Sequence, residues 1–249
     1  LDTWWCAVRS GEPPEDFSWR TQLLREGMQN CDALIAPSLA FAEATAAAHG
    51  VPRPLVVRNG RRRGAASIAG QTRNFVFAAG RLWDEGKNIA ALDAAAAEIG
   101  VEAFAAGDLE GPQGQRVALA RAHALGRLPP SGIAAWLSRR PIFVSCALYE
   151  PFGLSALEAA QAGCPLALSD IPTHRELWGG AAWLFDPRDP AGLAALLRRL
   201  SGEPELALAL GDAARARSMD YSIEAMAEGT LRTYAAVAPV FNEWLRDAA

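Results

Sequence analysis

Residues 141–170 read PIFVSCALYEPFGLSALEAAQAGCPLALSD, and the fold prediction starts from this stretch. Two short apolar runs, 141–146 and 164–170, have the composition of buried strands. Between them, residues 153–163 form an alanine-rich stretch that is typical of a helix. A strand, a helix and a second strand in this order indicate parallel strands in a sheet that helices cover.

The same alternation extends along the chain in both directions. Further strand-like runs lie at 33–37, 54–60, 74–80, 101–107 and 181–185. Helical stretches lie at 19–30, 38–49, 87–99, 131–139, 190–200, 203–218 and 222–237. The sequence therefore predicts an α/β fold with a parallel sheet covered on both faces.

Composition and charge exclude several classes of protein. The chain has 249 residues and a formal net charge of −4, and 51% of the residues are hydrophobic. This profile is typical of a soluble globular protein, and it gives no general attraction to nucleic acid. The four cysteines form no CxxC pair, so we expect reduced thiols in a cytoplasmic protein rather than a zinc site or a disulfide framework. No apolar run approaches the length of a membrane span, and no secretory signal is visible.

The predicted sheet has one edge at which a ligand would bind. In parallel α/β sheets, ligands bind beyond the carboxyl ends of the strands. The residues that follow the predicted strands are polar or glycine at Gly80-Arg81, 85–88, Gly107-Asp108 and 169–176. We expect these segments to share that edge with the stretch that begins at Tyr149.

Residues 149–158 combine a helix start with two carboxylates. Pro151 disfavours helical geometry at Glu150, and the helix is expected to begin near Gly153. The first amides of a helix lack internal acceptors and attract anionic or oxygen-rich groups, and Gly153 permits close approach. Glu158 would lie about 7–8 Å further along the helix axis. The two carboxylates could therefore grip two ends of an extended polyhydroxylated ligand, because carboxylates accept hydrogen bonds from hydroxyls in fixed geometry.

An anionic middle of such a ligand would need cations, and two are available. Arg81 and Lys87 follow a neighbouring strand on the same edge. Each charge-assisted bond could contribute roughly 1.5–3 kcal/mol. Each residue also has a simpler interpretation, since Arg81 could pair with Asp84 or Glu85 and Lys87 could be a surface residue. Their predicted co-location favours a site for a nucleotide ribose, a diphosphate and a sugar.

Two stretches carry a resemblance to a known family. GRLWDEGKNIAAL at 80–92 and YEPFGLSALEAAQAGCPLALSDIPTHREL at 149–177 resemble the donor-binding half of a family-4 type glycosyltransferase (glycosyl transferases group 1) of the GT-B fold. The resemblance covers about residues 32–237. It implies a Rossmann-like parallel sheet and the transfer of a sugar from a nucleotide-diphosphate donor, with retention at the anomeric carbon and without a metal ion.

The resemblance also implies roles for single residues. Glu150, Arg81 and Lys87 are the predicted catalytic residues, with Glu150 on hydroxyls of the donor sugar and the two cations on the diphosphate leaving group. The predicted donor-binding residues are Gly80, Phe152, Gly153, Leu154 and Glu158, of which Glu158 would hold the ribose. No metal and no cofactor other than the nucleotide-sugar co-substrate is expected. His174 is left off the catalytic list, because a histidine in such a position more often caps a helix or binds water.

The resemblance divides the chain into three parts. Residues 1–58 look like the end of an N-terminal acceptor domain, 59–225 like the donor domain, and 226–249 like a C-terminal helix that returns toward the N-terminal domain. A hinge is expected near 59–73, a stretch rich in glycine and arginine. The chain begins at Leu1 rather than at a methionine, so we expect a fragment, a processed product, or a chain that a partner completes. Peripheral membrane association would come through the missing domain.

Other functions remain open at this point. A non-catalytic module that binds nucleotide sugars and a sugar-nucleotide epimerase of the same architecture are the alternatives. A phosphorylase would need a longer chain and a pyridoxal lysine. An NAD-binding protein would need G-x-G-x-x-G after a strand, which the sequence lacks. The nucleotide base, the sugar and the acceptor, a glycan or a small molecule, are not determined by the sequence.

Overall fold

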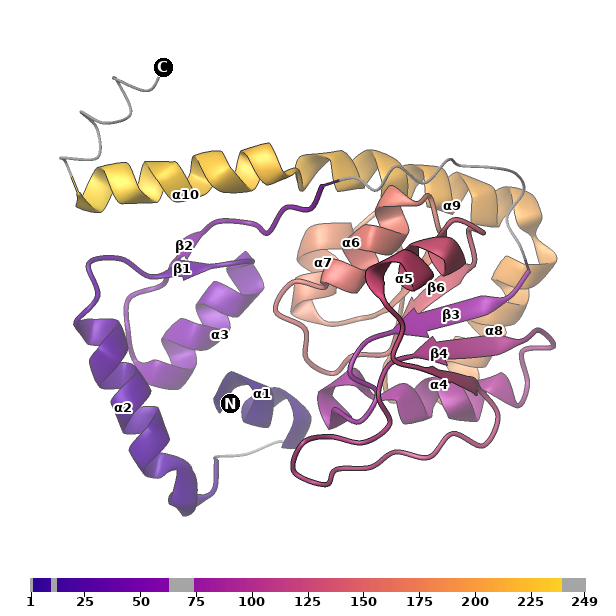
Figure 1. The fold of residues 1–249 in the computed structure, drawn as a ribbon, viewed down its shortest axis with the longest axis horizontal. Helices are drawn as coiled ribbons and strands as arrows, with labels where there is room; N and C mark the ends of the chain where they lie inside the picture. Colours follow the sequence, from indigo (N-terminus) through magenta and orange to yellow (C-terminus); the bar gives the residue numbers. More distant parts are fainter. Residues whose placement is uncertain (1, 10–12, 63–73, 239–249) are drawn as a thin grey trace. The chain divides into compact units, whose positions relative to one another are not determined.

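A six-stranded parallel sheet forms the centre of the larger part of the chain. The computed structural model describes residues 2–9, 13–62 and 74–238 (Figure 1). The strands are β3 (Val76–Ala79), β4 (Ala103–Ala106), β5 (His123–Gly126), β6 (Ile142–Ser145), β7 (Leu166–Ser169) and β8 (Trp183–Phe185). Their order in the sheet is β5-β4-β3-β6-β7-β8, and every neighbouring pair is parallel. The predicted α/β fold with a Rossmann-like parallel sheet is therefore confirmed.

Helices cover both faces of this sheet. α4 (Ile89–Ala96) and α8 (Pro190–Gly202) pack on each other, and they share an apolar core with Val76, Ile142 and Val144. On the opposite face, Phe77 stacks on Trp136 of α5 (Pro130–Leu137). α6 (Leu154–Gln161), α7 (Pro172–Trp178) and α9 (Pro204–Arg217) complete this part (Figure 1). Alternate side chains of one strand thus point to opposite helical layers, as a doubly covered sheet requires.

Two of these elements were not expected from the sequence. β5 carries His123 and Gly126 and forms an exposed edge of the sheet, so it lacks the apolar run that marks the other strands. α7 begins at Pro172, in the first helical position. The N–H that a proline lacks would have no partner within the helix there, so proline costs no hydrogen bond. It is short, and its polar start resembles a loop.

The chain divides into two compact units. One consists of residues 1–62 with 220–249, and the other of residues 63–219. The sequence analysis placed the boundaries after residues 58 and 225. Residues 63–73 of the predicted hinge at 59–73 lie outside the described residues, as do residues 239–249 of the predicted C-terminal helix.

The smaller unit has a two-stranded parallel sheet of β1 (Ile35–Ala36) and β2 (Leu55–Val56). Its helices are α1 (Asp2–Arg9), η1 (Glu15–Phe17), α2 (Ser18–Gln29), α3 (Leu39–His49) and α10 (Ile223–Val237), and the short η3 (Ser218–Asp220) spans the boundary between the units. Ser38 caps α3, because its hydroxyl accepts the amide N–H of Phe41, and Gly50 ends the helix with a φ of 61°.

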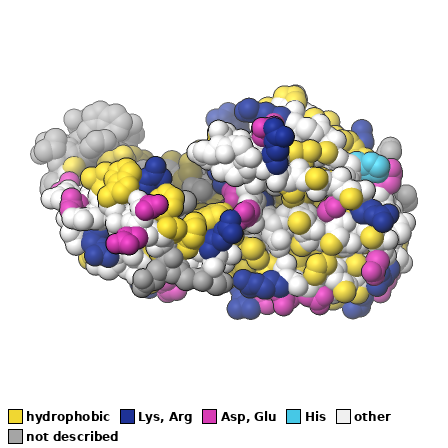
Figure 2. Space-filling model, turned by 90° about the horizontal axis from the view of Figure 1, so that it is seen from below, with side chains coloured by type: hydrophobic (Ala, Val, Ile, Leu, Met, Phe, Trp, Pro, Cys, Tyr) yellow, Lys and Arg dark blue, Asp and Glu magenta, His cyan; other side chains and the backbone are white. Residues whose placement is uncertain are grey.

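Charged side chains of both signs lie on the face that Figure 2 shows. Lys and Arg side chains lie there among Asp and Glu side chains and apolar groups. Among the described residues, no helix is long and apolar enough to cross a membrane.

Candidate functional site

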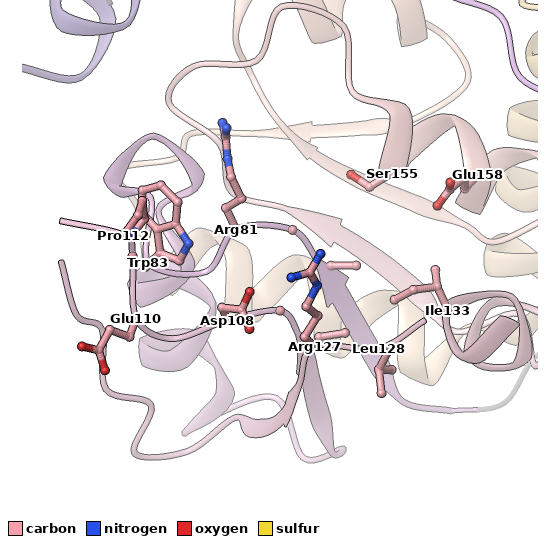
Figure 3. A pocket seen from close by; sticks show the side chains of 15 residues that line it. Arg81, Trp83, Asp108, Glu110, Pro112, Arg127, Leu128, Ile133, Ser155 and Glu158 are labelled. Carbon is pink, nitrogen blue, oxygen red and sulfur yellow. The ribbon is translucent and has the colours of Figure 1, made fainter. Parts of the chain in front are cut away.

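A cavity of about 800 Å³ lies where β3, β4 and β5 end. The carboxyl ends of these strands and the starts of two helices form its wall (Figure 3). Lining residues that follow a strand or open a helix include Gly80, Arg81, Gly107, Asp108, Arg127, Ile133, Ser155 and Glu158. The cavity thus occupies the edge at which open α/β sheets bind ligands.

Three of the predicted site residues line this cavity. Gly80 and Arg81 follow β3, and Glu158 reaches the cavity from the second turn of α6 (Figure 3). The other five, Lys87, Glu150, Phe152, Gly153 and Leu154, are not part of its wall. The two groups are adjacent, because a Cβ atom on Gly80 would lie 4.0 Å from Cε of Lys87.

Lys87 and Glu150 form a close ion pair beside the cavity. Nζ of Lys87 lies 2.5 Å from Oε2 of Glu150, and their side chains are 23% and 12% exposed. Oε1 of Glu150 accepts the amide N–H of Phe152 at 3.4 Å. The pair joins the turn after β3 to the loop after β6, which are 63 residues apart in the sequence. Lys87 is therefore not simply a surface residue.

Arg81 has the partner that its simpler interpretation named. Its Nη2 donates to Oδ2 of Asp84 at 2.9 Å, while the other carboxylate oxygen of Asp84 accepts the amide of Gly86. The Arg81 side chain is still 65% exposed. A guanidinium has five N–H donors, so the contact with Asp84 leaves donors that a ligand could use.

The glycines at this edge differ in why they are needed. At Gly107 a Cβ atom would lie 1.8 Å from the carbonyl oxygen of Gly80, so the fold excludes any other residue there. At Gly80 the nearest atom would be 4.0 Å away, so the fold itself does not require a glycine. Gly153, which precedes α6, has a φ of 91°. Gly153 is the N-cap of α6 and has no side chain that could accept the first amides of the helix, which like those of any helix lack an acceptor within it.

Hydrogen bonds to three residues, Gly86, Asn88 and Ser169, hold the loop that carries Glu150. Nδ2 of Asn88, a residue with a φ of 50°, donates to the carbonyl of Cys146 at 3.2 Å. The carbonyl of Gly86 accepts the amides of Leu148 and Tyr149 at 2.9 and 3.3 Å. The hydroxyl of Ser169 donates to the carbonyl of Ala147 at 2.5 Å.

The sequence analysis missed several residues that line the cavity. Arg127 escaped notice because it follows β5, the strand without an apolar run. Trp83 and Ser155 lie inside the quoted family stretches, but no role was assigned to them. Asp108 had been placed on this edge of the sheet without a function. A search for polar residues after every strand, exposed edge strands included, would have found Arg127.

The described cysteines differ in exposure, since Cys6 and Cys31 are exposed whereas Cys146 and Cys164 are buried. Burial raises the pKa of Cys146 to about 12 and raises that of Cys164 as well, so both stay protonated near neutral pH. No group of three or more His, Cys, Asp or Glu side chains in this part of the chain could hold a metal ion.

The sequence matches a known protein family over most of its larger unit. The sequence profile described as "Glycosyl transferases group 1" matches residues 67–217, more than half of the chain. The chain belongs to the glycosyl transferases group 1 family. The expected family is thereby confirmed, and its matched region includes the strands that build the cavity wall.

Single relatives of this group 1 glycosyl transferase chain agree with that assignment. It is 39% identical over 115 residues to a glycogen synthase of Mycobacterium tuberculosis, an alignment that covers 45% of this chain and 28% of that protein. The chain thus spans less than a third of the curated relatives it matches.

Solved structures share the fold. The sucrose-phosphate synthase of Thermosynechococcus elongatus superposes with a TM-score of 0.80 at 22% identity, over 96% of this chain and 66% of that one. The Anabaena protein HepE, in complex with UDP-glucose, superposes with a TM-score of 0.76 at 22% identity, over 90% of this chain and 70% of that one.

Proposed function

We propose that this chain carries the donor-binding part of a cytoplasmic glycosyltransferase that moves a sugar from a nucleotide diphosphate to an acceptor, with retention and without a metal ion. The observation that carries the proposal is the Lys87–Glu150 pair beside a cavity lined by Arg81 and Glu158. The family assignment supports the reaction class. Free cysteines, two of them exposed, suit a reducing compartment.

The cavity suits a ligand with hydroxyls and negative charge. Glu158 offers carboxylate oxygens to a ribose at one end, and Arg81 offers donors to a diphosphate. Gly80 leaves room for close approach of phosphate oxygens to the backbone, which the fold alone does not demand. HepE was solved with UDP-glucose, which makes UDP the first nucleotide to test.

Lys87 and Glu150 would act at the bond that breaks. An acceptor hydroxyl oxygen would form a bond to the anomeric carbon and lose its proton while the bond from that carbon to the diphosphate oxygen breaks, so negative charge accumulates on the departing diphosphate. Lys87 and Arg81 would stabilise that charge in place of a divalent cation, and Glu150 would bind hydroxyls of the transferred sugar. The nearness of Lys87 to Gly80 supports this arrangement.

Calorimetric titration tests the proposal. The purified chain is titrated with UDP, GDP and ADP and with their glucose and mannose conjugates, with and without EDTA. We expect saturable binding of one nucleotide that EDTA does not change. Lys87→Ala and Glu158→Ala should each weaken it about tenfold or more, because each removes a charge-assisted bond.

Arg232→Ala, which removes an exposed arginine of α10, is the charge-matched control for Lys87→Ala and should leave the affinity unchanged. A folded chain that binds none of these ligands would contradict the donor site. Binding that EDTA abolishes would contradict metal independence alone.

A further inference from the structure

A buried histidine is connected through Ser169 to the loop that carries Glu150. His174 is in the first turn of α7, and its side chain has no exposed surface. Its Nδ1 lies 2.9 Å from the carbonyl oxygen of Ser169 and 3.2 Å from the Ser169 hydroxyl. A carbonyl oxygen only accepts, so the hydrogen must reside on Nδ1, and the ring is held in one tautomer.

The histidine and Ser169 form a relay of hydrogen bonds that ends at this loop. The Ser169 hydroxyl donates to the carbonyl of Ala147, so it is an acceptor toward His174. The single N–H of Nδ1 is shared between the carbonyl and the hydroxyl of Ser169, and the hydroxyl donates in turn to the loop, an arrangement in which connected hydrogen bonds strengthen one another. Ala147 is buried and precedes Glu150 by three residues.

The turn that carries Lys87 also holds this loop. The carbonyl of Gly86 accepts from Leu148 and Tyr149, and Lys87 itself pairs with Glu150. The loop is therefore held by Ser169 and also by the turn of Gly86, Lys87 and Asn88. Loss of the His174 support would leave the Ala147 carbonyl fixed by a hydroxyl that is free to rotate.

A purely structural role would not require a histidine. Nε2 of His174 is buried and has no hydrogen-bond partner among the described residues. A buried polar atom without a partner is costly, whereas an apolar side chain in the same space would avoid that cost. The relay through Nδ1 is the feature that an apolar residue could not provide.

We propose that His174 is a positioning residue, which through Ser169 sets the loop so that Glu150 meets the donor sugar. The inference rests on the proposed function for the role of Glu150. Burial is the main cause that lowers the pKa of His174, which keeps the ring neutral near neutral pH. The Ser169 carbonyl and the charge of Glu150 raise this pKa, and Lys87 lowers it.

Two substitutions separate positioning from packing. His174→Leu removes the relay, whereas in His174→Asn the side-chain amide can still donate from near the position of Nδ1. Both variants and the wild type are titrated with UDP and with UDP-glucose. For His174→Leu we expect UDP affinity within about twofold of wild type and UDP-glucose affinity lowered about tenfold, the effect of one lost hydrogen bond.

His174→Asn should restore most of the UDP-glucose affinity. Equal losses for UDP and UDP-glucose, or no loss for either, would overturn the inference. An Asn variant no better than the Leu variant would overturn it as well.

A second measurement does not depend on nucleotide binding. The drop in melting temperature caused by Glu150→Gln is measured in the wild type and in His174→Leu. We expect a smaller drop in His174→Leu, because Glu150 is no longer held against Lys87. His123→Leu, which changes an exposed histidine of β5, is the control and should leave the drop unchanged. Additive effects of His174→Leu and Glu150→Gln would reject the positioning role, even if no nucleotide binds and the proposed function fails.

Discussion

Lys87 and Glu150 are each poorly placed without the other. Both side chains are mostly buried, and their charged atoms lie 2.5 Å apart. A buried charge that loses its partner is destabilising, whereas loss of both charges is much less so. The stability of variants of this pair therefore reports whether the two side chains are in contact when no ligand is bound.

We predict that Lys87→Met lowers the free energy of unfolding by about 1–3 kcal/mol. The double variant Lys87→Met/Glu150→Gln should recover at least half of that loss, because no uncompensated carboxylate remains. Urea denaturation measures both values. The exposed pair Arg232–Glu228 on α10 is the comparison, and its loss should cost less than about 0.5 kcal/mol. Equal losses for the two pairs would show that Glu150 is solvated rather than buried.

Gly153 is expected to matter for its backbone conformation and for its neighbour. Its φ is 91°, and an added Cβ would lie 3.4 Å from Cγ of Glu150. Gly180 has a comparable φ of 79° but open space around it. We predict that alanine at either position costs about 1–2 kcal/mol of stability through backbone strain. Only Gly153→Ala should also weaken nucleotide-sugar binding, which calorimetry measures. Equal binding by both variants would argue against a role of Gly153 in donor binding.

For single residues, the sequence predicted where the polar side chains lie better than it predicted which other side chains they contact. Gly80, Arg81 and Glu158 were placed at the strand edge, and they line the cavity there. The bond between Lys87 and Glu150 could not be read from the sequence, because 63 residues separate the two. The His174 relay was equally inaccessible, since a polar residue after a strand gives no sign of complete burial.

Among the elements, the connection between β4 and β5 depends on one carboxylate. Asp93 of α4 accepts the backbone amides of Ala120, Arg121 and Ala122 at 2.8–3.0 Å. Burial raises the pKa of Asp93, but the three amides outweigh burial and the net shift is downward. Because the pKa is lower in the folded state, ionised Asp93 stabilises the fold above its unfolded pKa of about 3.9. That contribution is lost as the pH falls through the lower folded value.

We therefore predict that Asp93→Asn destabilises this connection and makes the free energy of unfolding depend less on pH in the acid range. At pH 7 the variant should lose about 1–3 kcal/mol, because an amide offers one weaker acceptor oxygen in place of two charged ones. Between about pH 4 and pH 2 the wild type should lose more stability than the variant. Urea melts at each pH measure the difference, and hydrogen exchange at residues 120–122 locates it. Parallel pH curves would contradict the role of Asp93.

Arg140 connects β6, α6 and α9. It has a φ of 52°, and its guanidinium donates to the carbonyl of Gly163 at 2.9 Å and to Asp212 at 3.1 Å. The guanidinium is buried, whereas the side chain of Asp212 is 64% exposed. The buried bond to Gly163 should therefore contribute more than the ion pair.

We predict that Arg140→Ala lowers the free energy of unfolding by about 2–3 kcal/mol, and Asp212→Ala by less than about 1 kcal/mol. Arg140→Gly would relieve the positive φ and should recover only part of the loss. Chemical denaturation distinguishes the three variants. A loss for Asp212→Ala as large as that for Arg140→Ala would place the stabilisation in the ion pair instead.

The elements found from the sequence and those missed differ in burial. Runs such as residues 141–146 and 164–170 lie in the middle of the sheet, where strands are apolar throughout, and the structure has β6 and β7 there. β5 lies at the edge with three of its four residues exposed, so it has no apolar signal. The hydrophobic pattern thus predicts the centre of the sheet and loses the edge that contributes Arg127 to the cavity.

For the whole molecule, the two compact units differ sharply in their cores. Among the described residues, the largest fully buried side chains, which include Trp178, Phe77 and Phe143, all belong to the unit of residues 63–219. In the smaller unit the strands β1 and β2 are parallel, yet Ile35 and Leu55 are exposed. Parallel strands are normally covered on both faces, so the described residues of this unit provide little apolar burial to offset its conformational entropy.

We therefore predict two unfolding transitions, with the smaller unit melting first. Differential scanning calorimetry should resolve them, and tryptophan variants assign them, since Trp5 reports on one unit and Trp178 on the other.

A bound nucleotide at 100 times its Kd should stabilise only the later transition, by about 2.7 kcal/mol, because the cavity lies wholly in the unit of residues 63–219. A single transition that shifts as a whole would mean that the units unfold together. A shift confined to the first transition would place the nucleotide in the smaller unit, and the cavity beyond β3, β4 and β5 would then not be the donor site.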